Sequence, residues 1–304
     1  MVSKKGACPL TVLQYLFVVV LLLLGANIVY GSTDATDETV KPSDGVSQEN
    51  QDAHDRTQAG EVKLNKEYFK GFVTDTEDIL TSPARWGKSD WITASFMAGI
   101  TTGLYIYDEK IQTWAQRNKT NTTGDVVKAD KRIAAISIPA LGAFYLYGYY
   151  TDNDKAQKTV LLSVESAVIT GVFVQTLKYA THRHRPYTGD SHSSWDGPSL
   201  ENSNEHMSFP SGDASTAFSV ATVIASEYED NAVVPPLAYG IATVLALGRV
   251  HDNAHWSSDV FVASAIGYFT GKAVVRSHAA KQSNITLIPI MDGETTGLLL
   301  TYRF

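Results

Sequence analysis

Cysteine is almost absent from this sequence of 304 residues, and the only one is Cys8. A chain with one thiol near its start needs no oxidising compartment and has no cysteine-based metal site. An excess of basic residues is missing too, since 25 lysines and arginines face 32 acidic residues and the formal net charge is −7. This balance argues against a nucleic-acid partner. The zinc-binding motif H-E-x-x-H is also missing, although His251 and His255 stand four residues apart.

Long apolar runs are scarce, and the longest lies near the start of the chain. Lys4 and Lys5 precede "VLQYLFVVVLLLL", and the small residues of "ANIVYGS" follow it. A charged start, an apolar centre and a small-residue end are typical of a secretory signal. We therefore predict a signal peptide over residues 1–31 and an exported protein of the periplasm or cell envelope. The alternative is an uncleaved membrane anchor, but the apolar run is short for a membrane span.

Residues 32–62 have almost no large apolar side chains. They hold eight acidic and two basic residues and so carry most of the net charge of the chain. Such a segment cannot bury enough apolar surface to fold alone. We predict an acidic disordered linker here, and the charge of the chain therefore says little about its ligand.

Residues 63–280 have the composition of a helical domain. Six apolar stretches rich in Ala, Gly, Ser and Thr follow one another, at 91–107, 133–150, 160–177, 214–228, 237–247 and 260–275. Small residues let helices pack closely, so we predict an all-α bundle of about six core helices. The stretches are short against the roughly 20 residues of a membrane span, which favours a bundle outside the bilayer. A polytopic membrane protein stays an alternative, because 133–150 carries no charge.

The last segment, residues 281–304, has a different pattern. Two apolar, β-prone runs flank Asp292-Gly293, and Asp-Gly between such runs is a turn signal. The sequence predicts a short C-terminal β-hairpin.

Three polar clusters in the helical domain carry residues suited to chemistry. In the first, Lys178 stands seven positions before Arg185, a spacing close to two helical turns that places both on one face. Pro186 disfavours helix at Arg185 and frees its guanidinium to turn into a cavity. The alternative for Lys178 is a basic helix end that complements the helix dipole.

The second cluster is "PSGD", in which Ser211 and Gly212 offer a hydroxyl and bare N–H groups to an oxyanion at a helix start. Asp213 beside them is either a helix cap or part of the chemistry. The third cluster places His255 six positions after Arg249 and four before Asp259. An aspartate one helical turn away can hold one imidazole nitrogen and leave the other free to attack. A buried histidine with a satisfied partner is the alternative.

Together the clusters resemble the type 2 phosphatidic acid phosphatase and vanadium haloperoxidase superfamily, whose pattern is K-x6-RP, PSGH and SR-x5-H-x3-D. The resemblance covers roughly residues 90–275 and implies a helical bundle of that family's type. It implies that His255 attacks phosphorus, that Asp259 orients His255, and that no catalytic metal is needed. It also implies a set of phosphate-binding residues: Lys178, Arg185, Ser211, Gly212 and Arg249.

The sequence departs from this family pattern at two positions. Gly248 replaces a supporting serine, whereas Asp213 replaces the histidine that protonates the leaving group in the family. A free aspartate has a pKa of about 3.9, and nearby cations and a helix N-terminus favour its ionised form. Three interpretations of Asp213 follow. It is an acid whose proton is retained only when substrate is bound, or no acid is needed because the leaving group is good. In the third, the site binds phosphate but turns over poorly. His206 is a further candidate acid.

The leading interpretation is an exported, metal-independent phosphatase that acts on a phosphomonoester or a lipid phosphate or diphosphate through a phosphohistidine. A membrane surface is a further candidate partner, and no cofactor is expected. One alternative is a vanadate-dependent haloperoxidase, in which vanadate would occupy the same anion pocket. Another is a non-catalytic phosphate-binding or scaffold protein of the cell envelope.

Overall fold

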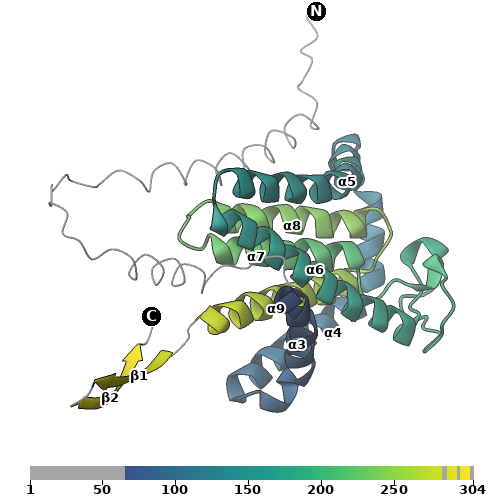
Figure 1. Ribbon diagram of the computed structural model, residues 1–304. Helices are drawn as coiled ribbons and strands as arrows, with labels where there is room; N and C mark the ends of the chain where they lie inside the picture. The colour runs from purple at the N-terminus through teal and green to yellow at the C-terminus, as the bar shows by residue number, and fades with distance from the viewer. Residues whose placement is uncertain (1–65, 283–285, 293–294, 302–304) are drawn as a thin grey trace, which may run out of the picture.

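The chain folds into an all-helical domain followed by two strands. The computed structural model describes residues 66–282, 286–292 and 295–301. The predicted signal peptide and acidic linker lie outside these ranges. The α-helices of the described part are α3 (Lys66–Thr81), α4 (Lys88–Arg117), α5 (Asn121–Tyr150), α6 (Asp154–Thr181), α7 (Gly212–Glu227), α8 (Val234–His251) and α9 (Ser257–Gln282) (Figure 1). The predicted all-α bundle is confirmed: the six apolar stretches fall on α4 to α9, and α3 is an addition.

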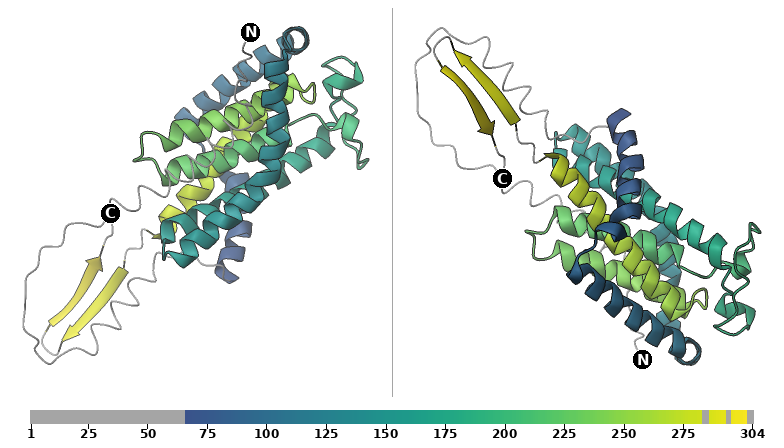
Figure 2. Two further views of the ribbon diagram at one scale, coloured as in Figure 1. Left: turned by 90° about the horizontal axis from the view of Figure 1, so that it is seen from above. Right: turned by 90° about the horizontal axis from the view of Figure 1, so that it is seen from below.

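Helix α7 forms the centre of the bundle and packs against α6, α8 and α9 (Figure 2). Small residues make this close packing feasible. A Cβ added to Gly267 on α9 would lie 2.2 Å from the backbone oxygen of Ser215 on α7, and one added to Gly271 would lie 2.8 Å from the Cβ of Thr222. The glycines of α9 therefore let two helix backbones approach more closely than any side chain would allow.

Local sequence signals fix where the helices begin and end. The Asn153 side chain accepts a hydrogen bond of 2.8 Å from the N–H of Ala156 and caps the start of α6, and His182 ends α6 in the left-handed region at φ 41°. Helix α7 begins directly after Pro210-Ser211, and α8 has prolines in its first turn. Hydrogen bonds bring the C-terminal ends of α6 and α8 to the N-terminal ends of α7 and α9. All three polar clusters thus lie at one end of the bundle.

The helices are longer than the apolar stretches from which they were predicted. Helices α4, α5, α6 and α9 have 26 to 30 residues, because their ends continue through polar residues that the hydropathy pattern does not mark. The length of the apolar stretches, which favoured a bundle outside the bilayer, therefore does not decide between that bundle and the polytopic alternative. Within the described residues α6 is long and apolar enough to span a bilayer, and half of its most apolar window is buried inside the protein.

The C-terminal strands β1 (Thr286–Asp292) and β2 (Thr295–Thr301) pair antiparallel, with Asp292 opposite Thr295. Figure 2 shows the two strands beyond the end of α9 and apart from the helices. The helical domain alone therefore builds the site described next.

Candidate active site

The segment between α6 and α7 holds Arg185 in place through its backbone. The N–H of Arg185 donates to the carbonyl of Glu205 at 2.9 Å, and the N–H of Ser208 donates to that of Arg183 at 2.9 Å. Residues 183–185 are therefore clamped along residues 205–208. The Arg185 side chain donates to the carbonyls of Asn204 and Ala254 at 2.6 and 3.2 Å. This turns its guanidinium towards the start of α9.

Lys178 is buried in the last turn of α6, and its ammonium donates to the Met207 carbonyl at 2.8 Å. Burial, followed by the charge of Arg185, lowers the pKa of Lys178 to about 8. Lys178 is still protonated at neutral pH, but its neutral form is easier to reach than that of an ordinary lysine. A bound anion would therefore favour the protonated form of Lys178.

His255 is 3% exposed, and its two ring nitrogens have different partners. Nδ1 lies 2.6 Å from the Ser208 carbonyl, and Nε2 lies 3.3 Å from Nη1 of Arg185. A carbonyl can only accept, so Nδ1 carries the proton and the lone pair is on Nε2. Burial, followed by the charges of Arg185 and Lys178, holds the pKa of His255 well below its ordinary value. The imidazole is thus neutral, and the lone pair of its Nε2 faces the Arg185 guanidinium.

Asp259 does not hold His255 directly, which corrects the role assigned to it. Its Oδ2 accepts from the Ser208 hydroxyl at 2.5 Å and from the Trp256 N–H at 3.0 Å, and its Oδ1 accepts from Nη1 of Arg183. Burial raises the pKa of Asp259, and the Arg183 guanidinium acts in the opposite direction. The carboxylate acts on His255 through Ser208, whose hydroxyl it fixes while the carbonyl of the same residue orients the imidazole.

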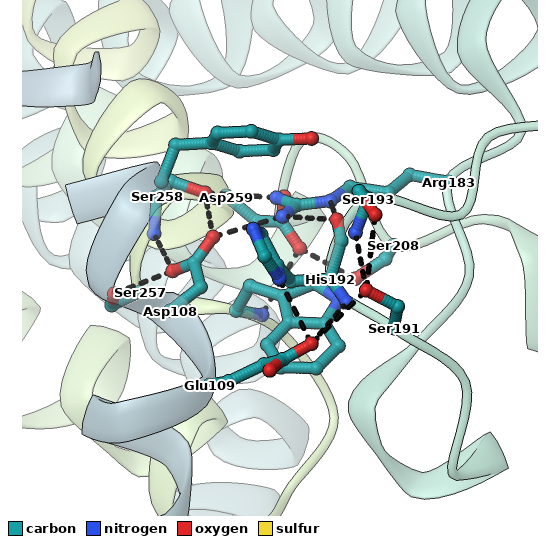
Figure 3. Close-up of polar contacts among 12 residues, drawn as sticks. Asp108, Glu109, Arg183, Ser191, His192, Ser193, Ser208, Ser257, Ser258 and Asp259 are labelled. Carbon is teal, nitrogen blue, oxygen red and sulfur yellow. Dashed lines mark hydrogen bonds and ion pairs between the residues drawn. The ribbon is translucent and has the colours of Figure 1, made fainter. Parts of the chain in front are cut away.

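Arg183 is the centre of a buried ionic network that the sequence did not reveal (Figure 3). Its guanidinium, 1% exposed, joins Asp259 of α9 to Asp108 of α4, whose Oδ2 lies 2.8 Å from Nη2. Asp108 also accepts from the Ser258 N–H at 2.9 Å and from the hydroxyls of Ser257 and Ser258, so it caps the start of α9. A buried charge needs such partners. The network locks α4, the α6–α7 segment and α9 together beneath His255.

Asp213 and Arg249 form an ion pair at the start of α7. Asp213 Oδ2 lies 3.0 Å from Nη1 of Arg249, and Asp252 Oδ2 lies 3.3 Å from Nη2. The Asp213 side chain is 58% exposed, whereas that of Arg249 is 10% exposed. Asp213 therefore does not cap the helix through its side chain. It pairs with Nη1 of Arg249, and the family resemblance assigns this guanidinium to phosphate binding.

Ser211 and Gly212 stand at the N-terminus of α7, as predicted. Ser211 is fully buried, its hydroxyl has no hydrogen-bond partner among the described residues, and its N–H donates to the Asp259 carbonyl at 3.3 Å. A buried hydroxyl without a partner costs free energy that a ligand oxygen would recover. Ser211 is thus suited to an oxyanion at the helix start.

His206 takes part in a separate cluster on the α6–α7 segment. Its Nδ1 lies 3.0 Å from Asp196 Oδ2, which also lies 3.0 Å from Nε2 of His184, and the two imidazoles stack at 4.1 Å. The ligand atoms of this trio could hold a cation. The ring is bound to Asp196, so the structure gives no support to His206 as a substitute for Asp213.

Sequence reasoning missed three buried supports of the site: Asp108, Arg183 and Ser208. Asp108 directly follows a predicted apolar stretch, and Arg183 is one of four basic residues in "HRHR". Nothing in the local pattern says which of them turns inward. Their roles depend on contacts across 47 to 150 positions of the chain.

Comparison with known proteins shows which family part of this chain is similar to. Residues 159–283 match the family model of the PAP2 superfamily. This range, about two fifths of the chain, is therefore similar to that superfamily, and it contains all three polar clusters.

One curated relative is the lipid A 1-phosphatase of Porphyromonas gingivalis, 28% identical over 138 residues. The match spans 44% of this chain and 28% of that relative. Among solved structures, LpxE of Aquifex aeolicus is similar with a TM-score of 0.43 and 18% identity, covering 56% of this chain and 94% of that one. A transmembrane PAP2-type phosphatidylglycerolphosphate phosphatase of Bacillus subtilis is similar with a TM-score of 0.42 and 15% identity, covering 70% and 95%.

Proposed function

We propose that this chain is a metal-independent phosphatase of the cell envelope that hydrolyses a lipid phosphate or diphosphate through a phosphohistidine at His255. The observation that carries the proposal is the state of His255. Its Nδ1 donates to the Ser208 carbonyl, so Nε2 presents a lone pair beside Arg185. A neutral, oriented imidazole surrounded by cations is an activated nucleophile for phosphorus.

The first chemical step follows from the charges around His255. Nε2 attacks phosphorus, the bond from phosphorus to the leaving oxygen breaks, and the leaving group departs with the bonding electrons. Lys178, Arg185 and Arg249, with the Ser211 hydroxyl, stabilise the charge that develops on the phosphoryl oxygens. Water then attacks phosphorus, and the bond from phosphorus to Nε2 breaks with its electrons returning to Nε2. The proton lost by the water leaves on the released phosphate, and His255 is neutral again. These cations supply the charge stabilisation for which other phosphatases use metal ions.

Asp213 points to the kind of leaving group. Its carboxylate accepts from the Arg249 guanidinium, and it stands where the family pattern has the histidine that protonates the leaving group. A leaving group that is stable without protonation needs no acid at this position. The phosphate released from a diphosphate is one, so a lipid diphosphate fits the site better than an alkyl phosphate does.

A lipid substrate agrees with the surface of the domain. Helices α4 and α5 expose large apolar side chains, among them Trp91, Phe96, Trp114, Ile138 and Tyr150 at 56 to 79%. Exposed apolar surface of this extent marks contact with a membrane or a protein. The lipid A phosphatase similarity favours the membrane, and the protein would then act at a membrane surface.

The test is phosphate release by the purified protein between pH 4 and 8. The substrates are p-nitrophenyl phosphate, phosphatidic acid and a polyprenyl diphosphate. We expect release that disappears in His255→Ala but persists in the control His251→Ala, with the diphosphate turned over fastest. An acid-labile, base-stable phosphoryl group on the wild type alone would identify the phosphohistidine. No release from any substrate would refute the proposal and favour a phosphate-binding protein.

A further inference from the structure

A second cluster of ionisable side chains lies inside the bundle, remote from His255. Asp75 of α3, Glu165 of α6 and His278 of α9 are 1%, 0% and 8% exposed. Nε2 of His278 lies 3.0 Å from Glu165 Oε2 and 3.5 Å from Asp75 Oδ2. Glu165 precedes Lys178 by 13 positions on α6, which at 1.5 Å per residue is about 20 Å. The cluster is therefore no part of the phosphate site.

The charges of this cluster call for a cation. Two buried carboxylates face one imidazole, and burying an ionised carboxylate is costly unless it is compensated. Glu165 Oε1 receives no hydrogen bond from the described residues. The neighbouring Asp75 carboxylate is also an acceptor, and it is buried like Glu165. Contact between two carboxylates requires a shared proton or a shared metal ion.

The surroundings of the cluster match a metal site. The donor atoms of the three residues lie within 4.8 Å of one another and come from three helices. The Ser277 hydroxyl donates to Asp75 Oδ1 at 2.7 Å and so orients that carboxylate from outside the trio, as outer partners of metal ligands do. Gly71 lies above Glu165 Oε1, since a Cβ there would be 3.6 Å from that oxygen. No side chain of residue 71 therefore competes for the orphan oxygen.

We propose that Asp75, Glu165 and His278 form a structural site for a divalent transition-metal ion that ties α3 to α6 and α9. Two carboxylates and one imidazole are ligands suited to Zn²⁺, Mn²⁺ or Fe²⁺, whereas Ca²⁺ and Mg²⁺ prefer oxygen alone. A divalent ion balances both carboxylates with His278 neutral. Its role is to hold helices, so the metal independence proposed for the phosphatase reaction is unaffected.

The test uses the purified full-length protein, stripped with a chelator and titrated with Co²⁺ as a spectroscopic probe. We expect one equivalent of Co²⁺ per chain, visible absorption bands, and a rise in the thermal midpoint. Glu165→Gln and His278→Gln should weaken Co²⁺ binding at least tenfold. Ser277→Ala leaves all three ligands in place, and we expect it to weaken binding by a smaller factor.

Two control variants make the assignment specific. Glu227→Gln changes another buried carboxylate, which lies 3.2 Å from the Lys158 ammonium, and should bind Co²⁺ like the wild type. His206→Gln disrupts the trio on the α6–α7 segment and should also leave this equivalent unchanged. A wild type that binds no Co²⁺ or Zn²⁺ would overturn the proposal. So would binding that survives in Glu165→Gln and His278→Gln but is lost in His206→Gln. If Glu165→Gln does not fold, Co²⁺ binding by the wild type and by Ser277→Ala still tests the proposal.

Discussion

Replacing Asp213 by asparagine separates its two roles, as an acid or as a competitor for Arg249. The substitution keeps the shape of the side chain but removes its charge and any acidic proton. The Asp213 side chain is 58% exposed, so its ion pair with Arg249 belongs to the class worth about 0.2–1 kcal/mol. Freeing Arg249 from this pair should therefore strengthen phosphate binding about 1.4- to 5-fold. Loss of a general acid would instead slow the reaction roughly 10²- to 10⁴-fold.

The assay is steady-state kinetics on p-nitrophenyl phosphate at pH 7. We expect Asp213→Asn to lower KM by that small factor and to change kcat less than about twofold. Asp252→Asn is the matched control, because Asp252 also pairs with Arg249, at 3.3 Å, without standing at the start of α7. Both variants should behave alike. A kcat that falls a hundredfold in Asp213→Asn but not in Asp252→Asn would refute our account and make Asp213 the general acid.

Four further substitutions test the electrostatics and packing of the domain. The pKa of Lys178 is lowered from 10.5 to about 8, so the unfolded state binds more protons than the folded state between these two pH values. The free energy of unfolding should therefore rise with pH over that window. The value of kcat/KM should fall above pH 8, because Lys178 then loses its charge. Lys178→Met should abolish both effects, and it should stabilise the protein at pH 7 by about 2 kcal/mol. This value is the free energy that corresponds to a pKa lowered by about 2.5, minus the free energy of the hydrogen bond that the substitution removes. Arg183→Met leaves two buried carboxylates uncompensated and should cost about 3–5 kcal/mol in urea unfolding; a loss below 1 kcal/mol would contradict a buried network. Gly267→Ala places a Cβ 2.2 Å from a backbone oxygen and should destabilise strongly, whereas Gly240→Ala, with nothing within 4 Å, should stabilise by up to about 1 kcal/mol; equal thermal midpoints for the two variants would contradict the helix packing.

Hydropathy alone does not show how long the helices are or which of their apolar side chains are exposed. The apolar stretches gave the number and order of the core helices, because apolar side chains must be buried wherever a helix packs. They did not give the helix ends, since capping residues such as Asn153 and polar terminal turns extend α6 to 28 residues. Whether a long helix is buried or exposed depends on its neighbours. Only the packing shows which apolar side chains of α4 and α5 remain uncovered.

The sequence by itself determined the helical class and the candidate site residues. The spacings of Lys178 to Arg185 and of Arg249 through His255 to Asp259 follow from helix periodicity and local turns, which neighbouring residues fix. Only the tertiary structure decided what holds those residues. Ser208 rather than Asp259 contacts His255, Arg183 joins two carboxylates from different helices, and Asp75, Glu165 and His278 meet across three. Such contacts depend on how helices far apart in the chain are arranged, and no local pattern encodes that arrangement.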